Sequence, residues 1–236
     1  MNKYLDSGNE ARINKAYESR DPRLQMAVIT PYAQYNGASS GIAHTYTLRW
    51  PYRGSDSAEP FDIRTDTNDK FYYLWRKFVP EGLEQTERDT YGLDIPLIRY
   101  AEVLLLKAEA LNEWGSTHES EAIRCVNEVR RRAGHVELNN ATYPATKVNG
   151  QSDLRERIRN EYYWEIGGED SMYFHELRWG TWKDKKFDNN RNGLMQMWGE
   201  TTYTWYWLGD QCWSWPIPAK EMEMNSNLEQ NEGWIN

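Results

Sequence analysis

Apolar residues recur at helical spacing in both halves of the segment 94–134. The first half places five of them on one stripe of a helix with about 3.6 residues per turn: Leu97, Ala101, Leu104, Ala108 and Leu111. The second half repeats this spacing with Ala122, Ile123, Val126, Val129 and Ala133. The pattern predicts helices over about 96–113 and 118–133 that pack antiparallel and bury Leu104, Ala108, Val126 and Val129 between them.

Residues typical of helix ends flank both stretches. Pro96 suits a first helical turn, and Gly134 provides a C-terminal stop. Ser116 and Glu119 match a capping box ahead of the second helix, and the basic run 130–132 suits the dipole at its end. The hairpin is close in length to a tetratricopeptide unit, and the sequence shows no second copy. Because a lone unit cannot bury both its faces, other residues, inside or outside this chain, must cover it.

The segments before this hairpin have a weaker pattern. Residues 1–20 indicate a short polar helix, which the Asp21-Pro22-Arg23 step ends before a β-like run at 24–30. Residues 31–94 show little periodicity, and irregular segments of that length usually serve a function.

Beyond the hairpin, a polar loop is expected at 135–151. Ser152 or Asp153 then caps a helix through Leu154, Ile158 and Tyr162, which breaks at Gly167-Gly168 and resumes as far as Trp179. We expect turns at 182–193, one strand of a hairpin at 201–207, and a proline-fixed extended segment followed by a short helix at the end. The predicted fold class is mainly α, a tetratricopeptide-like helical hairpin scaffold with long irregular loops and a few short strands.

Composition adds a bias toward half-buried aromatic residues. The 236 residues fit one large domain or two small ones, and the 39% apolar share lies below the usual value of roughly 45–50%. Tyr occurs 16 times and Trp 12 times, against 5 Phe. Tyr and Trp are favoured where a ring is half buried and its polar tip stays wet. This bias favours a ligand surface.

Charge and cysteine content exclude several classes. The net charge of −8 argues against a nucleic acid or an anionic membrane as the main partner, since both attract basic patches. Cys125 and Cys212 lack metal-ligand spacing, so we expect two unrelated thiols. We find neither a membrane-spanning stretch nor a signal peptide, and the polar start is what a chain cut from a longer protein would show.

Seven blocks along the chain carry a family resemblance: DPRL (21–24), WRKFVPEG (75–82), DIPLIRYAEVLLLKAEALNE (94–113), AIRCVNEVRRRAG (122–134), LRERIRNEYYWEI (154–166), LRWG (177–180) and PIPAKEMEMNSNLEQNEGW (216–234). In this order they resemble the C-terminal part of SusD/RagB proteins, the surface glycan-binding lipoproteins of Bacteroidetes. Two departures occur after Glu165. Glu169-Asp170 replaces the usual acidic-glycine step, and a single Arg178 replaces paired arginines.

The resemblance implies that residues 1–236 are a SusD/RagB C-terminal domain, a fragment without the N-terminal helical repeats and the lipidated signal region. It implies non-enzymatic binding of a glycan at the cell surface and delivery to a SusC-like TonB-dependent transporter in the outer membrane. The membrane would be contacted only through a lipid anchor outside this chain, and no cofactor is implied.

A sugar-binding site needs flat aromatic rings for the C–H face of the sugar and polar side chains for its hydroxyls. Two aromatic stretches meet this need, 32–75 and 198–207, the first interleaved with Asn36, Arg49, Arg53 and Asp56. The candidate ligand-binding residues are Tyr32, Tyr35, Tyr46, Trp50, Tyr52, Arg53, Trp75, Tyr203 and Trp205. For any one of these rings, packing in the core or a loop is the competing interpretation. Tyr203 and Trp205 could instead lie flat against Trp213 and Trp215.

Two alternatives stay open beside glycan capture. A structural partner of the transporter would have buried or scattered aromatics and no glycan site. A glycoside hydrolase would need two carboxylates in a cleft, and the one helical pair, Glu102 and Glu109, is better explained by ion pairing, Glu102 with Arg99, and by helix contacts. The sequence offers no catalytic motif and no histidine spacing typical of metal sites, so we expect neither catalytic residues nor a metal. Surface carboxylates leave a metal possible, and the oligomeric state is open.

Overall fold

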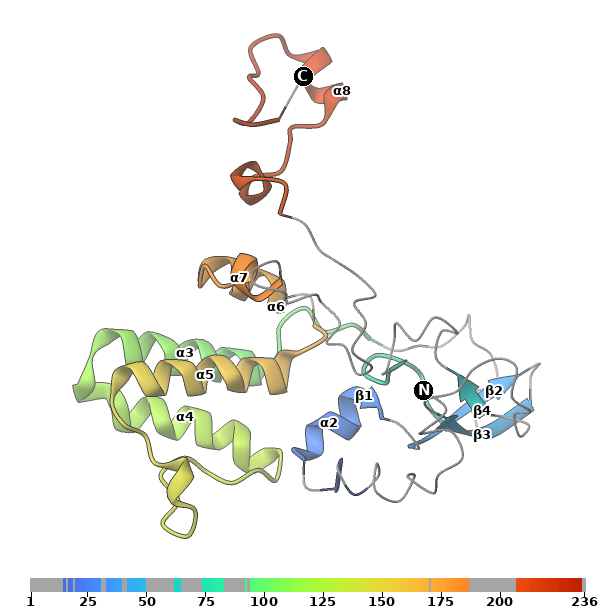
Figure 1. Ribbon diagram of the computed structural model, residues 1–236, viewed down its shortest axis with the longest axis vertical. Helices are drawn as coiled ribbons and strands as arrows, with labels where there is room; N and C mark the ends of the chain where they lie inside the picture. The colour runs from blue at the N-terminus through green and yellow to red at the C-terminus, as the bar shows by residue number, and fades with distance from the viewer. Residues whose placement is uncertain are drawn as a thin grey trace. The chain divides into compact units, whose positions relative to one another are not determined.

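The scaffold is a layer of three long helices (Figure 1). The structure is a computed structural model, and it describes residues 15, 17–18, 20–30, 33–39, 42–49, 62–64, 74–82, 92, 94–169, 171–186 and 207–234. The chain divides into two units, Met1–Phe174 and His175–Asn236. The long helices all belong to the first unit and are α3 (Tyr100–Trp114), α4 (Glu119–Arg132) and α5 (Gln151–Ile166).

Helices α3 and α4 form the predicted hairpin, and α5 packs mainly on α3. The four residues predicted to lie between the first two helices are all buried, namely Leu104, Ala108, Val126 and Val129. Helix α5 adds four nearly inaccessible side chains to this core: Leu154, Ile158, Tyr162 and Ile166. The expectation that further residues cover the hairpin is therefore confirmed on the α5 side.

The start of the hairpin differs from the prediction. Helix α3 begins at Tyr100, so Pro96 lies before the helix, and Leu97 is 90% exposed instead of buried. Arg99 is the N-cap with an extended backbone (φ −110°, ψ 149°), and its guanidinium is bound by Glu165 and Glu169. These ion pairs hold Arg99 outside the helix, which no local pattern in 94–99 indicates.

The capping box predicted at Ser116 and Glu119 was wrong, whereas the glycine stop was right. Ser116–His118 forms a short 3₁₀ helix (η1), and α4 starts at Glu119 without a side-chain hydrogen bond at its cap. At the other end Gly134 takes a φ of 70°. The N–H groups of Gly134 and His135 donate to the carbonyls of Arg131 and Arg130 at 3.1 and 2.8 Å, the Schellman pattern.

The Asp21-Pro22 step begins a helix instead of preceding a strand. Helix α2 (Pro22–Ala27) has Pro22 in its first turn, and the Asp21 carboxylate accepts from the Arg23 N–H at 2.9 Å. Only Val28–Ile29 (β1) is a strand, so the β-like run predicted at 24–30 was wrong for its first half. Most of the helix predicted at 1–20 lies outside the described residues.

Short strands occupy the region that lacks periodicity. Strands β2 (Gln34–Ser39) and β3 (Ile42–Arg49) form an antiparallel hairpin, and β4 (Asp62–Arg64) pairs in parallel with β3. Strand β5 (Leu74–Trp75) pairs antiparallel with β1, with Trp75 opposite Val28. Strands β2 and β3 pair locally, whereas β1 and β5 are defined by pairing between segments that lie far apart in the sequence.

A helix follows the polar loop, as predicted, but its cap lies earlier than Ser152 or Asp153. Helix α5 begins after Gly150, whose φ of 83° turns the chain directly into the helix, and Asp153 accepts from the Asn149 N–H at 2.8 Å. The short 3₁₀ turn η2 (Pro144–Thr146) lies within the preceding loop. The break at Gly167 is confirmed, and α6 (Ser171–Arg178) resumes the helix.

Shorter helices are found further along the chain. Helix α7 (Trp182–Lys186) replaces part of the turn predicted at 182–193, and η3 (Asp210–Trp213) precedes the extended segment. The predicted terminal helix is α8 (Ala219–Met224). The strand predicted at 201–207 falls outside the described residues, apart from Trp207.

The predicted fold class is confirmed, because helices dominate the described residues and the strands are short. Cys125 and Cys212 are free thiols, as expected. None of the described helices has the length and apolar composition needed to cross a bilayer.

Candidate functional site

The structure describes three of the nine predicted ligand-binding residues: Tyr35, Tyr46 and Trp75. The other six stay predictions outside the described ranges: Tyr32, Trp50, Tyr52, Arg53, Tyr203 and Trp205.

Three rings line one face of the β2–β3 hairpin. Tyr35 and Tyr46 are direct cross-strand partners, with ring centroids 6.4 Å apart, and His44 meets the Tyr46 ring edge-on at 6.1 Å. The Tyr35 hydroxyl donates to the Pro80 carbonyl at 2.7 Å, which fixes that ring. Because side chains alternate along a strand, Asn36 belongs to the opposite face, where its side-chain oxygen accepts from the Thr45 hydroxyl at 2.8 Å. Within the described part of this hairpin, the polar side chain of Asn36 therefore does not share a face with the Tyr35 and Tyr46 rings.

Trp75 is an exposed indole in a fixed position. It is 58% exposed, although its ring packs against the backbone of Gly168 in the turn after α5. A Cβ at position 168 would lie 2.6 Å from the ring, and Gly168 has a φ of 81°. Both the backbone and the indole therefore require glycine there.

The residues after Trp75 tie it to the β2–β3 hairpin. The Arg76 guanidinium donates to both Glu81 oxygens at 2.6 Å and to the carbonyl of Gln34 at 2.6 Å. These hydrogen bonds from Arg76 lower the pKa of Glu81. The Gly82 N–H donates to the Asn36 carbonyl at 3.2 Å. Trp75 and the aromatic hairpin are therefore joined by short, charge-assisted contacts.

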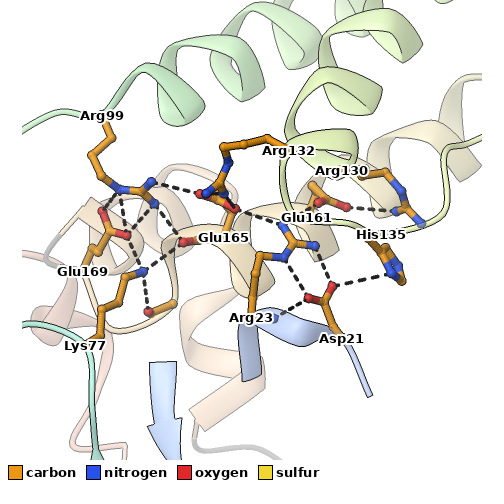
Figure 2. A network of polar contacts seen from close by, with 11 residues as sticks. Asp21, Arg23, Lys77, Arg99, Arg130, Arg132, His135, Glu161, Glu165 and Glu169 are labelled. Atoms are coloured by element: carbon orange, nitrogen blue, oxygen red, sulfur yellow. Dashed lines mark hydrogen bonds and ion pairs between the residues drawn. The ribbon is translucent and has the colours of Figure 1, made fainter. Parts of the chain in front are cut away.

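Lys77 ties the same segment to the end of α5 (Figure 2). Its ammonium donates to the carbonyls of Glu165 and Gly167 at 2.9 and 3.3 Å and forms an ion pair with Glu169. A cation suits the carbonyls at a helix C-terminus. Arg99 binds Glu169 at 2.7 Å and Glu165 at 2.9 Å from the other side.

A second group of charges in the same network surrounds Glu161 and Glu165 (Figure 2). Arg23 contacts Asp21 at 2.6 Å, Glu161 at 2.7 Å and Glu165 at 3.0 Å. Arg130 donates to Glu161 at 2.9 Å, and Arg132 reaches Glu165 at 2.5 Å. Each buried carboxylate thus meets at least two cations, as a buried ion needs.

Burial and ion pairing act on these carboxylates in opposite directions. Burial alone would raise the pKa of Glu165, but hydrogen bonds from Arg99 and Arg23 and the charge of Arg132 outweigh it and lower that pKa. Burial prevails at Glu161, whose side chain is 0% exposed, and raises its pKa despite two arginines. The pKa of Asp21 shifts in the same direction as that of Glu165. Burial would raise it, but the hydrogen bonds from Arg23 lower it.

This network was not among the predictions, although the sequence contains a signal for it. Glu161 and Glu165 continue the apolar stripe of Leu154 and Ile158 on α5. A carboxylate on the buried face of a helix indicates a buried ion pair. The basic run 130–132 was assigned to the helix dipole, whereas Arg130 and Arg132 also serve as partners in the network.

The carboxylates considered for catalysis lie elsewhere. Glu102 is buried in the helical layer and Glu109 is half buried. Arg99, proposed as the partner of Glu102, binds Glu165 and Glu169. Within the described ranges no three His, Cys, Asp or Glu side chains gather as metal ligands would.

Comparison with known proteins identifies the family. The model of the SusD family matches residues 3–234. The chain is 32% identical over 139 residues to SusD-like protein P38 of Formosa agariphila, covering 58% of this chain and 24% of that protein. It is 28% identical over 161 residues to the starch-binding protein SusD of Bacteroides thetaiotaomicron, covering 68% and 25%. The chain thus spans about a quarter of the length of these curated relatives.

Solved structures share the fold. A SusD-like protein from Bacteroides fragilis superimposes with a TM-score of 0.59 at 22% identity, over 93% of this chain and 40% of that one. A SusD homolog from Bacteroides thetaiotaomicron gives 0.50 at 21% identity, over 91% and 41%. These identities support the fold alone, whereas the family model spans nearly the whole sequence, as the seven blocks predicted. The chain belongs to the SusD family.

Proposed function

We propose that this chain is part of a cell-surface glycan-binding protein that does not cleave its ligand. The observation that carries the proposal is Trp75, an indole that is 58% exposed and yet fixed on Gly168. A flat exposed indole accepts the C–H face of a sugar, and a preorganised ring avoids part of the ordering cost of binding. Family membership supports the ligand class, and one relative is named a starch-binding protein.

The charge network supports binding over hydrolysis. A general acid or base must reach its substrate, whereas the Glu161 side chain is fully buried and the Glu165 side chain is 2% exposed. Both are paired with arginines, and one of these, Arg99, also binds Glu169 next to the glycine on which Trp75 packs. The network therefore acts as a support for the binding surface.

In the full-length protein, the glycan would be passed to a SusC-like TonB-dependent transporter in the outer membrane. The protein would be held at the cell surface by a lipid anchor that lies outside these 236 residues, in an N-terminal part that also carries further helical repeats. This placement rests on the family, and residues 1–236 would form its C-terminal part.

Affinity gel electrophoresis of the full-length protein tests the proposal. Wild type and Trp75→Ala are run through gels that contain amylopectin, xylan, laminarin, galactomannan or polygalacturonate. We expect at least one polysaccharide to retard wild type and Trp75→Ala to be retarded several-fold less at an unchanged melting temperature. Trp114→Ala is the matched control, because Trp114 is also exposed but lies on α3.

Other outcomes discriminate between the alternatives. Equal retardation of Trp75→Ala and wild type would move the site away from Trp75, and the Trp50→Ala/Tyr52→Ala double variant then tests the other predicted rings. Wild type that no polysaccharide retards would favour a structural role beside the transporter. Release of reducing ends, abolished by one carboxylate substitution, would establish a hydrolase.

A further inference from the structure

The second unit contains a cluster of three indoles, here called the tryptophan cluster: Trp182, Trp207 and Trp213. The ring centroids of Trp207 and Trp213 are 5.0 Å apart, and Trp182 meets these two rings at 5.8 and 6.3 Å in edge-to-face geometry. Such tilted and edge-on pairs are the arrangement that aromatic rings prefer. Helix α7 and the η3 turn thus share one aromatic surface.

A charged pair borders this cluster. The Lys183 ammonium lies 5.1 Å from the centre of the Trp207 ring and 3.3 Å from the Asp210 carboxylate. The Trp207 indole N–H donates to the same carboxylate at 3.2 Å. The hydrogen bonds from Trp207 and Lys183 lower the pKa of Asp210 and so favour its ionised form. Its side chain is 80% exposed and can accept further hydrogen bonds.

Residues 231–234 pack against the η3 turn that carries Trp213. The Trp234 indole donates to the carbonyls of Ser214 and Gln211 at 2.8 and 3.2 Å. A Cβ at Gly233 would lie 2.7 Å from the Gln211 side chain, so the terminal turn packs closely on η3. Asn231 donates to the Trp215 carbonyl at 2.6 Å. The η3 turn that carries Trp213 is therefore fixed by several contacts.

We propose that the tryptophan cluster, with Lys183 and Asp210, is a second carbohydrate-binding site that takes a neutral pyranose unit. The proposal rests on the proposed glycan-binding function and adds a separate site to it. Trp213 remains 40% exposed within the cluster, so part of an indole is open to a sugar ring. Asp210 would accept from sugar hydroxyls, and Lys183 would donate to them. Because these two charges neutralise each other, the site has no preference for an acidic sugar.

The same five polysaccharides provide the probe. On the neutral polysaccharide that wild type binds most tightly, we expect Trp213→Ala in the full-length protein to lose roughly five- to tenfold in affinity by calorimetry. Trp213→Phe, which keeps a ring, should stay within about twofold of wild type. Trp114→Ala, an exposed indole outside the cluster, should bind as wild type does.

Each outcome separates this inference from the proposed function. If wild type binds none of the polysaccharides, the proposed function fails and this inference fails with it. If wild type binds and Trp213→Ala binds equally well, only the second site is refuted, and the cluster is a packing core. Should Trp213→Ala melt early, Asp210→Ala replaces it, because an exposed ion pair contributes little to stability. Unchanged affinity of Asp210→Ala would then refute the site.

Discussion

Replacing Glu165 by glutamine tests the charge network most directly. The two Glu165 oxygens accept from Arg23 at 3.0 Å, from Arg99 at 2.9 Å and from Arg132 at 2.5 Å. Glutamine keeps the volume and one acceptor oxygen but removes the charge. The substitution therefore leaves the apolar core in place and weakens three ion pairs at once.

The loss of unfolding free energy in Glu165→Gln depends on which ion-pair partners each arginine retains. Breaking a buried ion pair costs about 3–5 kcal/mol. Arg23 retains Asp21 and Glu161, and Arg99 retains Glu169, so neither becomes an isolated buried charge. Arg132 is 59% exposed and can be hydrated, which makes its pair worth about 0–1 kcal/mol. We therefore expect Glu165→Gln to lower the free energy of unfolding by about 3 kcal/mol, the lower end of that range.

The matched control is Glu113→Gln. Glu113 accepts two hydrogen bonds from Arg155 at 2.6 Å, but both side chains are partly exposed. A pair of this kind contributes about 0.2–1 kcal/mol. Urea unfolding followed by circular dichroism at neutral pH compares the two variants with wild type, provided that the denaturant slopes agree.

The pH dependence has a defined sign. The pKa of Glu165 is lowered from 4.5 in the folded protein, so its stabilising contribution is present above 4.5 and is lost as the pH falls through the folded value. The gap between wild type and Glu165→Gln should therefore be constant near neutral pH and shrink in acid. The raised pKa of Glu161 gives the stability a pH dependence of the opposite sign. The diagnostic quantity is therefore the difference in unfolding free energy between wild type and Glu165→Gln, because Glu161 contributes to both curves. A Glu165→Gln loss no larger than that of Glu113→Gln would refute the reasoning.

Three further predictions concern the core, the turn after α5 and a hydrogen bond of the β2–β3 hairpin. Leu104→Ala should cost about 2–5 kcal/mol in urea unfolding, whereas Leu97→Ala, at a 90% exposed position, should be neutral, and equal losses would contradict the assigned core. Gly168→Ala should cost about 1–2 kcal/mol from its left-handed backbone plus a clash with Trp75, and in a Trp75→Ala background only the backbone part should remain. Tyr35→Phe removes the hydroxyl that donates to the Pro80 carbonyl. It should lower the free energy of unfolding by about 1 kcal/mol, which a lower melting temperature would show.

Local periodicity was sufficient to predict the helical scaffold. The stripe through Leu104 and Ala108 faces the stripe through Val126 and Val129, as predicted, because helix spacing alone decides which side chains share a face. The ends were less predictable, since caps compete with tertiary contacts. Arg99 shows this competition, because its ion pairs with Glu165 and Glu169 hold it outside α3.

The Asp21-Pro22 step was misassigned because its residues have two roles. Proline ends a preceding helix, but it also suits the first turn of a new one after an aspartate cap. The outcome depends on Arg23, which must reach Glu161 and Glu165 on α5. A helix at 22–27 places this guanidinium, and no local rule contains that requirement.

The charge network could be suspected from the sequence but not assigned. Glu161 and Glu165 lie on the apolar face of α5, which indicates buried partners. The chain contains 28 Lys and Arg residues, and the partners used come from four separate segments: Arg23, Lys77, Arg99 and 130–132. Their choice follows from the packing of α2, α4 and the β5 segment around α5, which the sequence does not specify.

The position of Trp75 connects this network with the proposed binding surface. Strand β5 is only two residues long and pairs with β1 through backbone hydrogen bonds. Lys77 adds a second anchor, because its ammonium meets two carbonyls at the end of α5 and the Glu169 carboxylate, which Arg99 holds in turn. Trp75 is therefore only two residues away from the anchor at Lys77. Its ring packs on Gly168, where any side chain would clash with the indole. Under the proposed function, a ring fixed in this way loses little freedom when a glycan binds, so the network contributes to the affinity through the position of Trp75.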